Sequence, residues 1–165
     1  MDTQLARPPS LMPLYAKALL RRGSATSLPD TTLALSDQPI DTDRLRRYQQ
    51  VCGYRVSDLL PPAYPHLMAF PLSMALMTGA DFPFPLLGLV HVENELVQHR
   101  PITAAERLTV RCWAENLREH PSGRSVDLVG EASVGDEPVW REVSTYLHRE
   151  RSSNGKHDRP VPVPG

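Results

Sequence analysis

The chain has 165 residues, of which 41% are hydrophobic, and its 18 Lys and Arg residues nearly balance 19 Asp and Glu residues. This length fits one domain, which buries roughly two thirds of the surface that the unfolded chain exposes. The net charge of -1 excludes a global positive field, so we expect no binding to nucleic acid or to an anionic membrane. The first residues lack a basic segment followed by an apolar run, so we expect a cytoplasmic protein.

The two cysteines, Cys52 and Cys112, each lie within an apolar pattern. We expect both to be buried, reduced thiols, and a disulfide is the less favoured alternative. The sequence contains no phosphate-binding loop, dinucleotide fingerprint, zinc ligand set or serine nucleophile motif. It therefore predicts neither a metal ion nor a cofactor.

Two helices and a strand are expected in the first third of the chain. The first helix covers residues 10–22, where Ser10 can cap the helix. The strand is "TTLALSDQPI", residues 31–40, which has β-branched residues and partial alternation. The second helix is "DTDRLRRYQQVCG", residues 41–53, with an acidic start. Its apolar stripe consists of Leu45, Tyr48 and Cys52.

The stretch "YPHLMAFPLSMALMTG", residues 64–79, carries no charge after His66 and is too short to cross a bilayer. Pro71 fits the first turn of a helix, where its missing N–H is no loss. Residues 72–78 continue the helix until Gly79 ends it. A helix that is apolar on nearly every side must be surrounded, so we expect another element to wrap around it.

From Leu87 onward the spacing of apolar residues changes to two, which is typical of strands. Turn signals at residues 120–123 and 134–138 separate long runs, and such short connections make neighbouring strands antiparallel. The inward faces of the last three strands are expected to be Leu108, Val110, Cys112 and Ala114; Val126, Leu128, Ala132 and Val134; and Val139, Val143, Thr145 and Leu147. The expected fold class is therefore α+β, with a curved antiparallel β-sheet wrapped around a central apolar α-helix.

The preceding strand, "GLVHVENELVQH", has polar residues at even offsets: His91, Glu93, Glu95 and His99. A regular strand would direct all four to one face, where imidazoles and carboxylates would suit a metal ion or a proton relay. The favoured alternative is the exposed face of a half-buried strand. Its inward residues would then be Val90, Val92 and Leu96.

A long apolar helix gripped by an antiparallel sheet is the hot-dog arrangement. The segments "LPPAYPHLMAFPLSMALM", "LGLVHVENEL", "HRPITAAERLTV" and "VWREVSTYLHRER" occur in this order. They resemble the N-terminal half of the double hot-dog members of the MaoC-like acyl hydratase and dehydratase family, and the likeness extends over about residues 54–149. The resemblance implies reversible addition of water to the 2,3 double bond of an enoyl thioester, carried by coenzyme A or acyl carrier protein.

The family's catalytic segment is an Asp and a His separated by four residues, with a His-Gly pair further on. Here Asp58 and His66 are eight positions apart, and Val92 follows His91. The chain therefore resembles the degenerate half, which widens the acyl channel, and we expect it to be a non-catalytic, acyl-thioester-binding half of a hydratase or dehydratase. We expect no acid and base together at the entrance of the central helix. Candidate substrate-binding residues are Phe70, Met74, Phe82 and Phe84.

Two other functions stay open. The chain can be a self-sufficient enoyl-CoA hydratase that uses His66 with Asp58 or Asp81, or a non-enzymatic acyl-CoA binding protein. Thioester hydrolysis is disfavoured, because hot-dog thioesterases place a carboxylate on the central helix and residues 72–78 contain none. Since a lone sheet leaves edge strands uncovered, we expect a homodimer or a heterodimer with a catalytic hot-dog subunit.

Three parts of the chain are expected. Residues 1–23 form an N-terminal helical segment, and residues 24–151 form the hot-dog domain. Residues 152–165, "SSNGKHDRPVPVPG", have three prolines at alternate positions after a polar run. This composition predicts a disordered tail or an extended linker.

Overall fold

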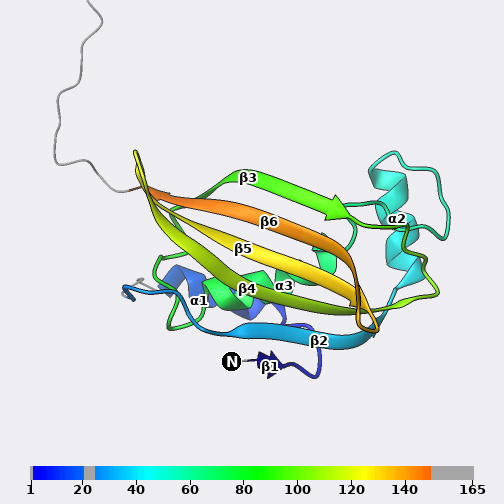
Figure 1. Ribbon diagram of the computed structural model, residues 1–165, viewed down its shortest axis with the longest axis horizontal. Helices are drawn as coiled ribbons and strands as arrows, with labels where there is room; N and C mark the ends of the chain where they lie inside the picture. Colours follow the sequence, from blue (N-terminus) through cyan, green and yellow to red (C-terminus); the bar gives the residue numbers. More distant parts are fainter. Residues whose placement is uncertain (1, 21–24, 150–165) are drawn as a thin grey trace, which may run out of the picture.

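The computed structural model describes residues 2–20 and 25–149. Its helices are α1 (Leu11–Leu20), α2 (Thr42–Val51) and α3 (His66–Met77). Its strands are β1 (Asp2–Gln4), β2 (Thr32–Pro39), β3 (Leu89–Gln98), β4 (Arg107–His120), β5 (Gly123–Val134) and β6 (Glu137–Arg149). The strands form one sheet in the order β1-β2-β4-β5-β6-β3 (Figure 1). β1 pairs with β2 in parallel, and the remaining pairs are antiparallel.

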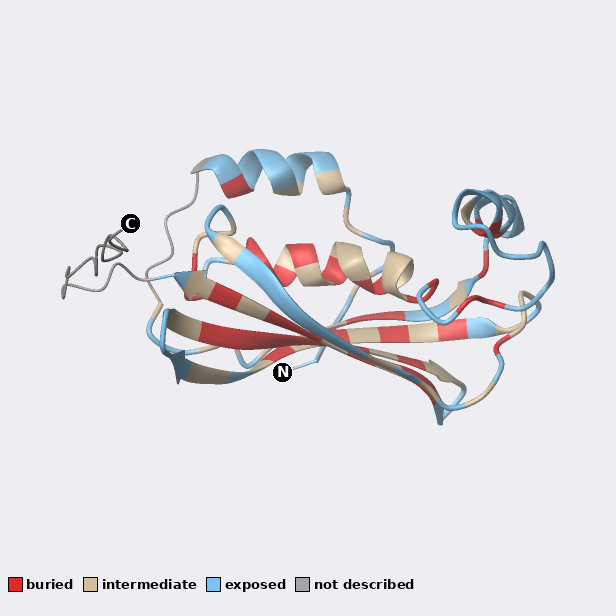
Figure 2. Ribbon diagram, turned by 90° about the horizontal axis from the view of Figure 1, so that it is seen from above, coloured by how far each residue is buried: buried red, intermediate tan, exposed pale blue. Residues whose placement is uncertain are grey.

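The sheet curves around α3, and α1 lies on the side of α3 that faces away from the sheet (Figure 2). The helix α2 lies beyond one end of the sheet, apart from α1 and α3 (Figure 1). The main apolar core lies between α3 and the concave face of the sheet. The expected central helix, wrapped by an antiparallel sheet, is thus confirmed. No helix in the described part of the chain is long and apolar enough to cross a membrane.

The helix α3 begins at His66, five residues before Pro71, so the expectation that Pro71 lies in the first turn was wrong. Pro65 occupies the position before the first helical residue instead. A proline inside a helix removes one backbone hydrogen bond and crowds the carbonyl of residue Leu67, four positions earlier. Burial of the apolar side chains of α3 against the sheet outweighs this local cost.

The close approach of α3 to the sheet depends on a residue without a side chain. A Cβ at Gly130 of β5 would lie 3.3 Å from the Cβ of Ala69 and 3.3 Å from the ring of Trp140. Trp140 is itself fully buried, and its indole N–H donates to the backbone oxygen of Pro62 at 2.8 Å. This bond fixes the segment that leads into α3 and therefore the position of His66.

The second helix forms as expected. Asp41 is its N-cap, with a side chain that accepts a hydrogen bond from the backbone N–H of Arg44 at 2.9 Å. Leu45 is buried, but Cys52 is exposed, so the expectation that both thiols are buried was wrong for Cys52. The whole of α2 lies beyond one end of the sheet, so no described strand covers the end of the helix, which Cys52 caps (Figure 1). Cys112 is buried and free, and burial raises the pKa of its thiol to about 12.

The predicted inward faces of β4 and β5 are largely confirmed, since Leu108, Val110 and Cys112 are fully buried against the core. The predicted face of β6 was wrong. Trp140 lies opposite Ala132, and Ser144 lies opposite Leu128, so the even-numbered residues of β6 face α3. Both alternating sets of β6 contain apolar residues, and only the register with β5 decides which set meets the helix.

The strand β3 lies at the edge of the sheet and is irregular. Its pairing with β6 shifts between His91 and Glu93, which leaves Val92 as a bulge. His91 therefore lies opposite Tyr146 on the α3 side, whereas Glu93 lies opposite Thr145 on the outer side. The four polar residues do not share one face, and Val90 and Val92, expected to point inward, are exposed.

The predicted division of the chain into an N-terminal segment, a hot-dog domain and a tail stays a prediction. Residues 2–4, within the expected N-terminal helical segment, form a strand that extends the sheet. The helix expected over residues 10–22 is present as α1. Residues 152–165 lie outside the described residues.

Candidate functional site

One row of side chains on α3 leads to a cavity beside the helix. His66, Phe70 and Met74 are spaced four residues apart, which places them on one face of the helix. Phe70 and Met74 line an apolar cavity of about 320 Å³ between α3, α1 and the loop before β3. The cavity is lined by Tyr15, Ala18, Leu19, Phe70, Met74, Met77, Leu86, Leu87 and Tyr146. A cavity of this composition suits an alkyl chain.

An imidazole and a carboxylate meet one helical turn before Phe70. The Nδ1 atom of His66 lies 2.7 Å from Oε2 of Glu142 on β6. The other carboxylate oxygen of Glu142 accepts a hydrogen bond from the side-chain amide of Asn94 at 2.8 Å. Asn94 in turn accepts from the hydroxyl of Ser144 at 3.4 Å. The side chain of Glu142 is only 5% exposed, against 35% for His66.

The sheet register explains why a buried position carries Glu142. Glu142 lies opposite Gly130, which lets Ala69 of α3 approach the sheet beside the carboxylate. Asn94 lies opposite Ser144 because the β3 bulge shifts the alternation by one residue. A buried carboxylate is costly unless hydrogen-bonded, and here each oxygen has a donor.

Tyr146 connects this polar cluster to the cavity. Its ring lines the cavity and stacks on His91 of β3, with ring centroids 4.8 Å apart. Burial, and next the charge of Glu142, raise the pKa of the Tyr146 hydroxyl above its ordinary value. The hydroxyl therefore keeps its proton at neutral pH and can donate a hydrogen bond. No described residue hydrogen-bonds to it.

The structure corrects the expected surroundings of His66. The carboxylate beside it is Glu142, rather than Asp58 or Asp81, which are both exposed. The expectation that no acid and base lie together at the entrance of the central helix was wrong. Glu142 was missed because it is 76 residues from His66 in the chain, and only the register of β6 brings the two together. The sequence offered one signal for this site: Glu142 is an acidic residue within a predicted strand, between Trp140 and Ser144.

The four predicted substrate-binding residues separate into two pairs. Phe70 and Met74 line the same cavity. Phe82 and Phe84 are fully buried in the loop after α3 and pack edge to face, with ring centroids 6.2 Å apart. Phe84 also stacks on His148, and the guanidinium of Arg124 lies 5.0 Å from its ring centroid. The substrate-binding role of all four stays a prediction.

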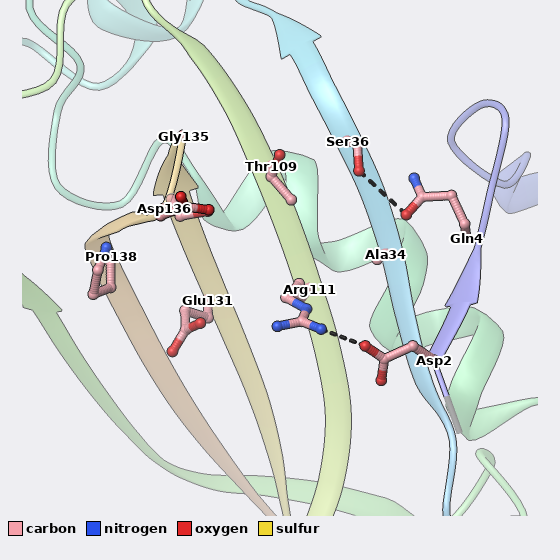
Figure 3. A pocket seen from close by; sticks show the side chains of 11 residues that line it. Asp2, Gln4, Ala34, Ser36, Thr109, Arg111, Glu131, Gly135, Asp136 and Pro138 are labelled. Carbon is pink, nitrogen blue, oxygen red and sulfur yellow. Dashed lines mark hydrogen bonds and ion pairs between the residues drawn. The ribbon is translucent and has the colours of Figure 1, made fainter.

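A second hollow, of about 480 Å³, lies on the outer face of the sheet over β1, β2, β4 and β5 (Figure 3). Its lining is polar and includes the charged side chains of Asp2, Arg111, Glu131 and Asp136. Arg111 forms an ion pair with Asp2, and Ser36 donates to Gln4 at 3.2 Å (Figure 3). Over residues 2–20 and 25–149, no group of three or more His, Cys, Asp and Glu side chains is arranged to hold a metal ion.

The chain resembles known proteins in sequence. A comparison with protein-family models finds no match. The chain is 42% identical over 135 residues to 3-hydroxyacyl-thioester dehydratase X of Mycobacterium tuberculosis (strain ATCC 25618 / H37Rv). The match covers 82% of this chain and 48% of that protein, so the chain spans about half the length of its curated relative.

The fold agrees with solved structures. The crystal structure of HtdX of Mycobacterium tuberculosis matches with a TM-score of 0.66 at 43% identity, over 72% of this chain and 51% of that chain. In sequence and fold the chain resembles the hot-dog dehydratases of the MaoC-like family. The fold expected from the sequence, an α+β hot-dog, is thus confirmed.

Two more distant structures resemble this hot-dog chain in fold alone. The HadBC complex of Mycobacterium tuberculosis, a 3R-hydroxyacyl-ACP dehydratase, matches with a TM-score of 0.57 at 17% identity. The match covers 76% of this chain and 95% of that chain. A MaoC-like dehydratase from Phytophthora capsici matches with a TM-score of 0.60 at 16% identity, over 83% of this chain and 52% of that chain.

Proposed function

We propose that this chain is the acyl-thioester-binding, non-catalytic hot-dog unit of an (R)-specific enoyl-CoA hydratase or 3-hydroxyacyl-thioester dehydratase. The observation that carries the proposal is the apolar cavity along Phe70 and Met74. It lies beside the central helix of a chain related to a 3-hydroxyacyl-thioester dehydratase. The alkyl chain of the thioester would occupy this cavity, and its carrier would be coenzyme A or acyl carrier protein.

The non-catalytic role is supported by the state of Glu142. Hydration requires a base that activates a water molecule and an acid that protonates C2 of the substrate. Both oxygens of Glu142 already accept hydrogen bonds, from His66 and Asn94, and its side chain is only 5% exposed, which disfavours a role as the base that activates water. His66 and Glu142 bond to each other instead of presenting two groups to one water.

A partner would then supply the catalytic Asp and His. The edge strand β3 is the natural place for it to dock. Val92 is 50% exposed and Val97 is 42% exposed there, and an edge strand offers unpaired backbone N–H and C=O groups. The partner is either a second copy of this chain or a different hot-dog subunit.

The test is to tag the full chain in its own cells, recover it with its partners and assay hydration of enoyl-CoA. We expect the complex to hydrate the substrate and the purified chain alone to bind it without turnover. Val92→Lys, on the exposed edge, should reduce recovery of the partner without unfolding the chain. Robust hydration by the chain alone would overturn the proposal.

A self-sufficient hydratase is the second candidate function, and the contact between His66 and Glu142 favours it. In that case the pair itself would serve as acid and base. His66→Ala would abolish hydration by the purified chain while the chain remains folded. A purified chain without turnover excludes this candidate.

A further inference from the structure

The contact with Glu142 fixes which nitrogen of the His66 ring donates to the carboxylate. A carboxylate only accepts hydrogen bonds, so the Nδ1 atom of His66 is the donor in the 2.7 Å contact. In the neutral ring the other nitrogen, Nε2, is then an acceptor. No described residue donates to Nε2. Because Glu142 is also held by Asn94, the orientation of the imidazole is set by two strands rather than by α3 alone.

His66 lies at the end of the row of α3 side chains that continues with Phe70 and Met74. The ring centroids of His66 and Phe70 are 5.6 Å apart, and Phe70 lines the cavity. The row changes from apolar at Met74 and Phe70 to polar at His66 over one turn, which is about 6 Å of helix. Two hydroxyl donors also belong to residues that line the cavity, Tyr15 of α1 and Tyr146 of β6.

We propose that His66, oriented by Glu142, is a binding residue that accepts a hydrogen bond from the 3-hydroxyl group of a 3-hydroxyacyl thioester whose alkyl chain occupies the cavity. The proposal rests on the acyl-binding function above and adds selectivity to it. Phe70 and Met74 contact alkyl groups whether or not C3 is hydroxylated. His66 Nε2 distinguishes the two, because a saturated acyl chain has no donor at C3.

The choice of the hydroxyl follows from the chemistry of the acceptor. A thioester carbonyl is itself an acceptor and gains nothing from the lone pair of a neutral imidazole. The hydroxyl O–H is the donor of the acyl group, and its oxygen can accept in turn from a phenol such as Tyr146. The amides of the coenzyme A arm are also donors, but they are common to all acyl thioesters and give no selectivity.

The experiment measures binding of two coenzyme A thioesters of equal chain length, one (R)-3-hydroxyacyl and one saturated, to the full chain by calorimetry. One hydrogen bond to a neutral partner should make the hydroxyacyl ligand bind roughly 3- to 10-fold tighter. His66→Phe, which keeps an aromatic ring, should remove the preference. Glu142→Gln should reduce it, because Asn94 and His66 then compete for one acceptor oxygen.

Met74→Ala is the matched control, since it should weaken both ligands by the same factor and keep their ratio. Nitrogen NMR of the histidines should find the proton of His66 on Nδ1 in the unmodified chain and a mixture of tautomers in Glu142→Gln. Equal binding of both ligands, or a preference that survives His66→Phe, would overturn this inference and leave the acyl-binding function intact. Failure of the chain to bind either ligand would instead overturn the acyl-binding function.

Discussion

The two sides of α3 contact different surroundings. Ala69, Leu72 and Leu76 pack on the sheet and are at most 5% exposed, whereas Phe70 is only partly buried beside a cavity. On the sheet side the helix and the sheet approach closely, since a Cβ at Gly130 would lie 3.3 Å from the Cβ of Ala69. The cavity side combines alkyl-lined space with a polar end at His66. One side of the helix therefore serves stability, and the other borders the cavity in which we propose that the acyl chain binds.

The largest expected effect lies on the sheet side. Leu72 is completely buried, and Leu72→Ala would leave a cavity in a close-packed core. We expect a loss of about 2–5 kcal/mol in the free energy of unfolding. Denaturant unfolding of the full chain measures this. A loss below about 1 kcal/mol would mean that α3 does not pack on the sheet as described.

The cavity side should give the opposite result. Phe70→Ala should cost less stability than Leu72→Ala, because the ring of Phe70 already borders open space. We expect it to weaken binding of a long-chain acyl-CoA by about tenfold, through loss of roughly 1–2 kcal/mol of apolar contact. Calorimetry checks the binding, and denaturant unfolding checks the stability. Unchanged binding would remove the distinction between the two sides.

The outer face of the sheet is a third region to compare with the two sides of α3. Asp127 is buried there, and burial would raise the pKa of its carboxyl. Hydrogen bonds from Thr145, Asn116 and Arg118 outweigh burial and hold this pKa below its ordinary value. A carboxyl whose pKa falls on folding stabilises the native state above the unfolded-state pKa, and this stability is lost as the pH falls through the native-state pKa.

We therefore expect Asp127→Asn to destabilise the chain on the order of 1 kcal/mol at pH 7. The difference from the unmodified chain should shrink as the pH falls below about 4, where the carboxyl becomes protonated in the unfolded state. Urea unfolding across this pH range measures both effects. Acyl-CoA binding at pH 7 should be unchanged, and a change in binding would place ligand on the outer face.

The smallest expected effect is in the polar hollow of Figure 3. Arg111 and Asp2 form an exposed ion pair, with side chains 44% and 61% exposed. We expect Arg111→Gln to change stability by less than about 1 kcal/mol, because exposed pairs contribute little. It should leave acyl-CoA binding unaltered. A large loss of binding would show that the hollow, rather than the cavity, receives the ligand.

Local patterns predicted the elements well. The cap at Asp41, the alternation from Leu108 to Ala114 and the uncharged run of α3 each have a short-range physical cause. They were sufficient for the hot-dog fold, with its central helix and antiparallel strands. The strand β1 was missed because three exposed residues carry no periodicity, and pairing with β2 alone forms it.

The site was harder to predict because it depends on register. Phe70 and Met74 could be selected as cavity residues because they belong to one continuous helix. Glu142 could not, since the alternation of β6 leaves open which face meets α3. The bulge at Val92, which brings Asn94 to Glu142, has no local signature in the sequence. The pairing of the strands in the folded sheet decides where Glu142 and Asn94 lie.

Photo-crosslinking tests the central claim most directly. An acyl-CoA with a diazirine at the end of its alkyl chain would be irradiated with the full chain, and the labelled residues would be identified by mass spectrometry. We predict labels on cavity-lining residues such as Phe70, Met74 and Leu87, which an excess of unlabelled acyl-CoA prevents. Labels confined to the outer hollow around Arg111, or none that acyl-CoA competes for, would contradict the account.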